Sequence, residues 1–236
     1  LPAPKPVPKI FPDEVCTKML NIKVFKSSGP DNIPNRIIKD YAYELAEPIC
    51  HIFNTSLSTG EFPNIWKDAL IIPIPKAPSV TCEEELRPIS LTASLSKIFE
   101  DFVVSWMVDD VKHKINPQQF GCLKGSSTTF CLIDMINNWL RTLDDKSSYL
   151  RIAFLDFSKA FDHIDHNILV SKLLALGVSL SLIPWICSFL SNRRQSVKID
   201  NFQSDWGTNN AGVPQGTKLG PILFIIMIND LELASS

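Results

Sequence analysis

The feature that most constrains this fold is an apolar run that ends on an acid, RIAFLDF at residues 151–157. Successive side chains of a strand point to opposite faces, and this run is apolar at both sets of positions. A strand that is apolar on both faces is buried on both. The run therefore predicts a buried central strand with Asp156 at its carboxyl end, where a sheet opens to solvent.

Asp156 is a candidate metal ligand, because Mg²⁺ prefers oxygen ligands and binds one or two carboxylates alongside water and substrate phosphates. An aspartate that only forms the turn after the strand fits the spacing equally well. Farther along, Asp162 or Asp165 is expected to cap the next helix. His163 and His166 have no third ligand nearby, so a metal pair is not favoured, and His166 is expected at the helix start.

Two basic residues flank one loop. Lys76 closes the apolar stretch 69–75, and Arg87 follows a loop that contains Glu83–Glu85. Together they could contact a polyphosphate, the arginine through paired hydrogen bonds and the lysine as a point charge. The alternative is a solvated turn in which they form ion pairs with the local glutamates.

The stretch GVPQGTKLGP at 212–221 places Gln215 and Gly216 just before an apolar helix. Two glycines around a glutamine suit a close approach of the backbone to a ligand. The spacing fits neither a phosphate-binding P-loop nor a dinucleotide fingerprint. An ordinary loop-to-helix connection is the alternative.

Strands that are few and separated by helices predict an α+β fold. The proline-rich residues 1–12 predict an extended linker. The expected helices are 13–22, capped by Asp13, 37–57, interrupted at Pro48, and 90–111, 127–143, 165–177 and 182–192. Residues 214–231 are expected to form a Gly-rich turn that runs into an apolar helix. The expected strands, besides 151–157, are 69–75, at a sheet edge because of its two prolines, and a hairpin of 195–200 with 204–212.

Composition excludes several classes of protein. With 45% hydrophobic and 20% charged residues among 236, the chain resembles ordinary globular domains. A net charge of −2 argues mildly against a chain that wraps nucleic acid. Six scattered cysteines favour reduced thiols and an intracellular protein. The longest apolar stretch, 221–228, is too short to span a membrane, and there is no sign of a secretory signal.

Seven stretches occur together in the order of one family, and residues 13–231 resemble the reverse transcriptase of non-LTR (LINE-like) retrotransposons, of the jockey-like kind. These stretches are KSSGPDNIPNRIIK, FPNIWKDALIIPIPK, LRPISLTASLSKIFED, QQFGCLKGSSTT, FLDFSKAFDHIDHNIL, LSNRRQSVKI and AGVPQGTKLGPILFIIMINDL. The resemblance implies a right-hand polymerase fold, with an N-terminal extension and fingers over 13–148, an incomplete palm over 149–236, and no thumb.

The resemblance also implies a reaction. An RNA template, a DNA primer and deoxynucleoside triphosphates would be the partners, and two Mg²⁺ ions the cofactors, which activate the primer 3′-hydroxyl and stabilise the leaving pyrophosphate. Asp156 matches the first metal-binding aspartate, and the backbone carbonyl of Phe157 is implied as a further ligand. An active retroelement enzyme of this kind is expected in the nucleus.

The nucleotide-contacting residues are implied in the same way. Lys76 and Arg87 match finger residues that hold the incoming triphosphate. Phe161 matches the bulky side chain that excludes a 2′-hydroxyl and so selects deoxynucleotides. Gln215, with Gly216, matches the motif that packs near the nucleotide and the template base.

Departures from the family pattern weaken part of this interpretation. Cys122 and Leu123 replace an aromatic residue and an arginine after QFG, and Leu86 stands where an aromatic residue is frequent. No aromatic-x-Asp-Asp motif follows Asp156, and one carboxylate cannot hold two divalent ions. The 236 residues alone are therefore expected to be inactive. A non-catalytic remnant, or a domesticated nucleic-acid-binding protein, is the alternative.

Overall fold

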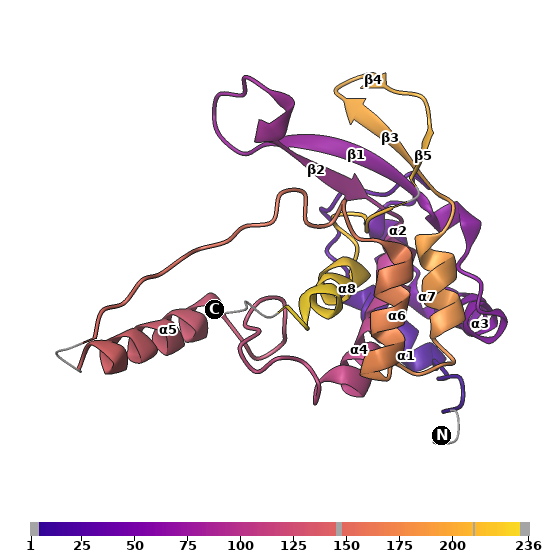
Figure 1. The fold of residues 1–236 in the computed structure, drawn as a ribbon. Helices are drawn as coiled ribbons and strands as arrows, with labels where there is room; N and C mark the ends of the chain where they lie inside the picture. The colour runs from indigo at the N-terminus through magenta and orange to yellow at the C-terminus, as the bar shows by residue number, and fades with distance from the viewer. Residues whose placement is uncertain (1–4, 145–147, 210, 232–236) are drawn as a thin grey trace.

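The computed structural model describes residues 5–144, 148–209 and 211–231. A mixed sheet lies at one end of the molecule, most of the helices lie below it, and one helix stands apart from the body (Figure 1). The α+β class predicted from the sequence is confirmed. No helix within the described ranges is both long and apolar enough to cross a bilayer.

The sheet has the strand order β2-β1-β3-β4, with β5 also paired to β3. Strand β1 pairs antiparallel with β2 and parallel with β3, while β3 pairs antiparallel with β4 and β5. The predicted hairpin after residue 195 is therefore confirmed. The strand bounds are β1 Asp68–Pro75, β2 Leu86–Leu91, β3 Arg193–Ile199, β4 Phe202–Gln203 and β5 Gly207–Asn209.

The prediction that β1 lies at a sheet edge is wrong, because β1 lies between β2 and β3. The ladder tolerates Pro73 and Pro75 because of their positions in the hydrogen-bond pattern. The backbone N–H of Lys76 donates to the carbonyl of Glu85, and hydrogen-bonded pairs alternate along an antiparallel ladder. Pro73 and Pro75 therefore fall where a backbone N–H would point away from β2. The pairing with β3 ends at Ile71, so these two prolines remove no hydrogen bond from the sheet.

Helix bounds follow the sequence signals closely. The α-helices are α1 Pro12–Leu20, α2 Asn35–Asp40, α3 Ala42–Thr59, α4 Ser94–Val111, α5 Thr128–Leu143, α6 His166–Leu176, α7 Ile183–Leu190 and α8 Leu219–Ile228, and two short 3₁₀ helices span Asn64–Trp66 and Glu83–Glu85. Asp165 caps α6 by accepting hydrogen bonds from two backbone N–H groups, and Gly177 ends it in a left-handed conformation, as expected.

Three details of the predicted helices are wrong. The carboxylate of Glu14, not that of Asp13, accepts the hydrogen bond at the start of α1, from the N–H of Phe11. Pro48 does not interrupt α3, because buried side chains before and after it pack the helix into the core; the break falls at Tyr41 instead. The predicted helix 90–111 begins only at Ser94, because residues 90 and 91 belong to β2.

The core is built around aromatic rings from α3, α4 and α7. Phe53 stacks on Phe99 with a centroid distance of 4.4 Å, and Trp185 meets Phe99 edge-on at 4.8 Å. The indole N–H of Trp185 donates to Ser56 Oγ at 2.9 Å. Ile10 is also buried and exchanges hydrogen bonds with the side chain of Asn54. The end of the predicted linker therefore belongs to the core, whereas residues 1–4 lie outside the described residues.

The prediction of a buried strand at 151–157 is wrong in this structure. The segment runs as extended chain from α5 toward α6 without pairing to a described strand (Figure 1), and Phe154 and Leu155 are 78% and 71% exposed. A strand needs a neighbour for its backbone N–H and C=O groups, and none of the described strands lies beside this segment. Helix α5, which precedes it, has no buried residue.

Candidate nucleotide-binding site

The β1–β2 hairpin places the two predicted basic residues on one face. Arg87 lies directly opposite Ile74 in the register, and Lys76 follows Ile74 by two positions, so all three side chains share a face. The side chain of Arg87 is exposed and has no hydrogen bond or ion pair to any described residue. The Nζ of Lys76 donates to the backbone carbonyl of Glu84 at 2.6 Å.

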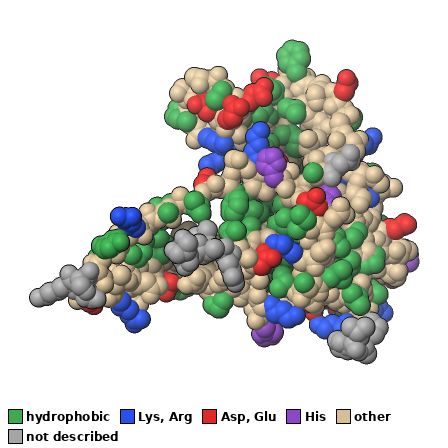
Figure 2. All heavy atoms as spheres, viewed as in Figure 1, with side chains coloured by type: hydrophobic (Ala, Val, Ile, Leu, Met, Phe, Trp, Pro, Cys, Tyr) green, Lys and Arg blue, Asp and Glu red, His purple; other side chains and the backbone are tan. Residues whose placement is uncertain are grey.

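The loop between β1 and β2 is acidic. The pKa of the exposed Glu84 carboxyl is lowered, first by a hydrogen bond to its own backbone and then by Cys82 and the positive charges of Lys159 and Lys76. Figure 2 shows acidic side chains over this hairpin and basic side chains next to them. Lys76 thus contacts the turn through the backbone carbonyl of Glu84. It does not form the ion pair with a local glutamate carboxylate that the alternative interpretation predicted.

The loop that carries Gln215 and Gly216 docks on the free edge of β2. The N–H of Ser90 donates to the carbonyl of Gln215 at 2.8 Å. Gly216 has a φ of 120°, and an added Cβ would lie 2.7 Å from the carbonyl oxygen of Ser90. A side chain at this position would therefore push the loop away from the strand. Ser90 is only three residues along β2 from Arg87, about 10 Å away.

The turn that carries Phe161 lies against the same loop. The N–H of Val213 donates to the carbonyl of Phe161 at 2.8 Å, and a Cβ on Gly212 would come within 2.7 Å of that oxygen. The ring of Phe224 on α8 contacts two rings of this region. Its centroid lies 5.5 Å from that of the half-buried Phe161 and 5.9 Å from that of Phe157. These contacts join segments that are more than 50 residues apart in the sequence.

Asp156 lies on the extended segment next to Phe157 and is exposed. Among the residues that the structure describes, no group of three or more His, Cys, Asp or Glu side chains could hold a metal ion. The described side chains therefore do not form a two-metal site around Asp156. His166, at the start of α6, forms a 2.8 Å hydrogen bond between its ring Nε2 and the carbonyl of Gly212.

A buried carboxylate that the sequence analysis missed fixes the loop of Gln215 and Gly216. Glu100 on α4 is fully buried, and its Oε2 accepts hydrogen bonds from the backbone N–H groups of Lys218 at 2.7 Å and Leu219 at 3.2 Å. Its Oε1 accepts from Ser96 Oγ at 2.7 Å. Burial raises the pKa of Glu100, an effect that these hydrogen bonds and Arg193 oppose. A glutamate on the otherwise apolar face of a helix is the signal that could have revealed it.

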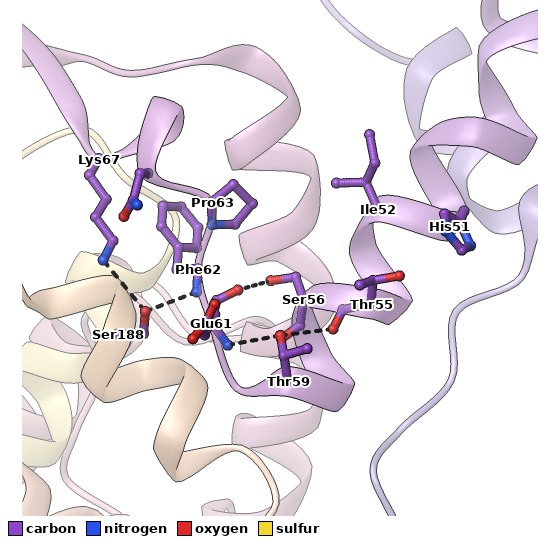
Figure 3. A pocket seen from close by; sticks show the side chains of 11 residues that line it. His51, Ile52, Thr55, Ser56, Thr59, Glu61, Phe62, Pro63, Lys67 and Ser188 are labelled. Atoms are coloured by element: carbon purple, nitrogen blue, oxygen red, sulfur yellow. Dashed lines mark hydrogen bonds between the residues drawn. The ribbon is translucent and has the colours of Figure 1, made fainter.

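A separate cavity of about 630 Å³ lies between α3, the following turn and α7. Figure 3 shows Lys67 at its wall, with Nζ directed at Ser188. Burial lowers the pKa of this lysine. None of the site residues predicted from the sequence lines the cavity.

Comparisons with known proteins identify relatives over most of the chain. Residues 74–234 match the family described as reverse transcriptase (RNA-dependent DNA polymerase). The chain is 33% identical to the probable RNA-directed DNA polymerase from transposon BS and 33% identical to the RNA-directed DNA polymerase from mobile element jockey, both of Drosophila melanogaster. Each match covers 96% of this chain and 25% of the relative.

A more distant match is the Pol polyprotein from the retrotransposable element R2DM of the same fly, at 25% identity over 89% of this chain and 19% of the relative. The chain thus spans about a quarter of the length of the BS and jockey polymerases.

Proposed function

Because this chain belongs to the reverse transcriptase (RNA-dependent DNA polymerase) family, we propose that it forms the nucleotide-binding part of an RNA-directed DNA polymerase of a non-LTR retrotransposon. One observation supports this proposal above the others. The Phe161 turn and the Gln215–Gly216 loop meet through backbone hydrogen bonds at the edge of β2, whose hairpin carries Lys76 and Arg87.

Lys76 and Arg87 are proposed to bind the triphosphate of an incoming nucleotide. They share one face of the hairpin, and the guanidinium of Arg87 has no partner among the described residues. A guanidinium can bind phosphate oxygens in pairs, while an ammonium acts as a point charge. A triphosphate would compete with the carbonyl of Glu84 for Lys76, so we expect this lysine to turn toward the nucleotide when one binds.

Phe161 and Gln215 are proposed to contact the nucleotide itself. The ring of Phe161 is held against Phe224, so it would present a fixed wall to the sugar and exclude a 2′-hydroxyl. The backbone of Gln215 is held by Ser90, which leaves its side chain available to pack near the nucleotide and the template base.

Membership of the family implies the use of a divalent metal. Asp156 and the carbonyl of Phe157 are proposed as its ligands, with Mg²⁺ as the ion, which would activate the attacking hydroxyl and neutralise the phosphates. The described residues supply one carboxylate here, which does not fit a two-ion site. We therefore expect no primer extension by the isolated 236 residues, and synthesis above background on an RNA template would contradict this expectation.

Nucleotide binding can be tested on the chain alone. A photoreactive deoxynucleoside triphosphate should label the wild-type protein, and the Lys76→Gln/Arg87→Gln double variant should be labelled at least tenfold less. Lys112→Gln removes an exposed charge from the far end of α4 and should leave labelling unchanged. Equal labelling of all three proteins would contradict the proposed roles of the hairpin.

The proposed role of Asp156 is tested in a chimeric polymerase. The chain can replace the matching quarter of the jockey polymerase, and RNA-templated primer extension by the chimera can be measured. Asp156→Asn should abolish extension, while Asp162→Asn, an exposed neighbour, should retain it. An active Asp156→Asn chimera would contradict the proposed metal ligand.

A non-catalytic nucleic-acid-binding protein is the second candidate. The single carboxylate at the proposed metal position and the Cys122-Leu123 departure favour it. This candidate predicts binding of nucleic acid without photolabelling by the triphosphate, so the labelling experiment separates the two. A nuclear location is proposed only for the polymerase.

A further inference from the structure

The cavity between α3, the turn that follows it and α7 contains a buried lysine without a counter-ion. Lys67 is only 6% exposed, and within the described residues no carboxylate oxygen lies within 4.0 Å of its Nζ. The one hydrogen bond of this Nζ, to Ser188 Oγ, is 3.5 Å long (Figure 3), whereas such bonds usually measure about 2.7–3.2 Å. An ammonium group has three N–H donors. Most of the capacity of Lys67 to donate is therefore unused by the described residues.

Hydrogen bonds between the three segments hold the walls of this cavity in place. Ser56 Oγ on α3 accepts from the indole N–H of Trp185 at 2.9 Å and donates to the backbone carbonyl of Glu61 at 2.5 Å. Ser188 Oγ on α7 accepts from the backbone N–H of Phe62 at 2.9 Å. The turn is thus fixed to both helices. A ligand would enter a site whose walls are already formed, which lowers the cost of binding.

The lining offers further hydrogen-bond donors beside apolar surface. Ser188 Oγ is the acceptor in both of its described hydrogen bonds, so its own proton can be donated to a ligand. The side-chain amide of Asn64 also lines the cavity and has no partner among the described residues. Ile52 and Pro63 supply apolar surface. A volume of about 630 Å³ lies within the range of sites for small organic molecules.

The charges around the cavity favour a ligand with one negative charge. Burial, and then the positive charge of the buried Arg193, lowers the pKa of Lys67, which Glu61 opposes. An anion next to Lys67 would offset both the lost hydration and this repulsion. The exposed Glu61 and His51 are the other titratable residues of the lining. Because Glu61 carries a carboxylate, a ligand with several negative charges, such as a triphosphate, would be repelled.

We propose that this cavity binds a small organic monocarboxylate, with the carboxylate on Lys67 and Ser188 and the apolar part of the ligand against Ile52 and Pro63. The site is separate from the nucleotide site, because none of Lys76, Arg87, Phe161, Gln215 and Gly216 lines it. The proposal goes beyond the proposed function and does not depend on it.

Benzoate is the probe for the first experiment, which uses the wild-type chain as it is. Saturation-transfer difference NMR should show binding of sodium benzoate. Benzamide has the same ring and almost the same shape but no charge, and it should bind at least tenfold more weakly. Inorganic triphosphate at the same concentration should not displace benzoate, because Glu61 disfavours a polyanion.

Two variants locate the site. Lys67→Met removes the ammonium but keeps a side chain of similar length, so the chain should still fold and benzoate should bind at least tenfold more weakly. Lys112→Met, at an exposed lysine near the end of α4, is the matched control and should bind benzoate like the wild type. Circular dichroism of both variants verifies that they are folded.

A change on the opposite wall gives an independent test. Ile52 is 41% exposed on α3, and Ile52→Asp would place a second carboxylate in the lining. Benzoate should then bind at least threefold more weakly. Ile37→Asp, at a 46% exposed isoleucine of α2 that does not line the cavity, should have no effect.

Four results would overturn the proposal. These are no binding of benzoate by the wild type, equal binding of benzoate and benzamide, displacement of benzoate by triphosphate, and equal affinities of the folded Lys67→Met and Lys112→Met variants for benzoate. Equal weakening by the two aspartate variants would show that benzoate binds elsewhere and would overturn it as well.

Discussion

Glu100 offers the sharpest test of how this fold holds its candidate site. Its buried carboxylate accepts three hydrogen bonds, two of them from the backbone at the start of α8. Glu100→Ala would leave those two N–H groups and the Ser96 hydroxyl without this acceptor in a dry environment. Glu100→Gln keeps the size of the side chain and one carbonyl oxygen for the helix.

The size of the effect follows from these contacts. An unsatisfied buried polar group costs about 1–3 kcal/mol, so we expect Glu100→Ala to lower the free energy of unfolding by roughly 3–5 kcal/mol. Glu100→Gln retains an acceptor and removes a carboxylate whose ionisation burial opposes. Its free energy of unfolding at neutral pH should stay within about 1 kcal/mol of the wild type.

The dependence on pH has a definite sign. Burial raises the pKa of Glu100 above its ordinary value of 4.5, so between 4.5 and the raised pKa the folded chain binds a proton that the unfolded chain has lost. The wild type should therefore lose stability as pH rises through that window, by up to about 1.4 kcal/mol per pH unit. Below pH 4.5 both states are protonated, and the contribution of Glu100 no longer changes.

Urea unfolding of the wild type and both variants at a series of pH values measures these effects. The difference between wild type and Glu100→Gln isolates the titration of Glu100 from that of other buried acids such as Asp31, whose pKa is also raised by burial. A difference that is constant from pH 4.5 to pH 8 would refute the linkage. Equal destabilisation by the Ala and Gln variants would refute the capping argument.

Three other predictions concern the same chain. Gly29→Ala should cost about 1–3 kcal/mol in urea unfolding, because its Cβ would overlap backbone atoms of residues 92–93, while Gly121→Ala, whose Cβ would meet only a flexible side chain at 3.4 Å, should change stability by less than about 0.5 kcal/mol. Burial lowers the pKa of Lys67 below its ordinary value of 10.5, so the wild type should gain stability as pH rises from the lowered pKa to 10.5. Lys67→Met should remove that gain, and parallel pH profiles of the two proteins would contradict this prediction. Helix α5 exposes an apolar face to solvent (Figure 2), so polar substitutions there should reduce self-association in sedimentation velocity without lowering the midpoint of unfolding; the substitutions are Leu132→Gln, Ile136→Gln and Leu140→Gln.

Elements whose start and stop signals are local were predictable from the sequence. Helix α6 lies between Asp165 and Gly177, both of which act through the backbone next to them. The continuity of α3 through Pro48 was not predictable in this way, because core packing of neighbouring side chains outweighs one lost hydrogen bond. The position of β1 was missed for a related reason, since its neighbour β3 comes more than 100 residues later.

In the candidate site, too, the residue types were predictable from the sequence and the contacts between distant segments were not. A lysine, an arginine, a phenylalanine and a Gln-Gly pair could be selected from the sequence, through resemblance as much as chemistry. The contacts that bring the Phe161 turn and the Gln215–Gly216 loop to the edge of β2 are backbone hydrogen bonds between distant segments, such as that from the N–H of Ser90 to the carbonyl of Gln215. Glu100 was missed because a single acid within an amphipathic helix does not reveal which backbone groups it will meet. The functional roles of all these residues remain predictions.

Asp156 is the clearest example of a residue whose position no local signal determines. The composition of 151–157 is that of a buried strand, yet Phe154 and Leu155 are exposed because no described strand offers its backbone to this segment. At its carboxyl end the segment is already anchored, through the ring of Phe157 against Phe224. A strand that paired with 151–157 would bond its backbone N–H and C=O groups and fix the carboxylate beside that anchor. The geometry of the proposed metal ligand therefore depends on a pairing between segments. Hydrogen exchange of the 151–157 amides, in the chain and in the polymerase chimera, measures this pairing directly. We expect these amides to be protected in the chimera alone.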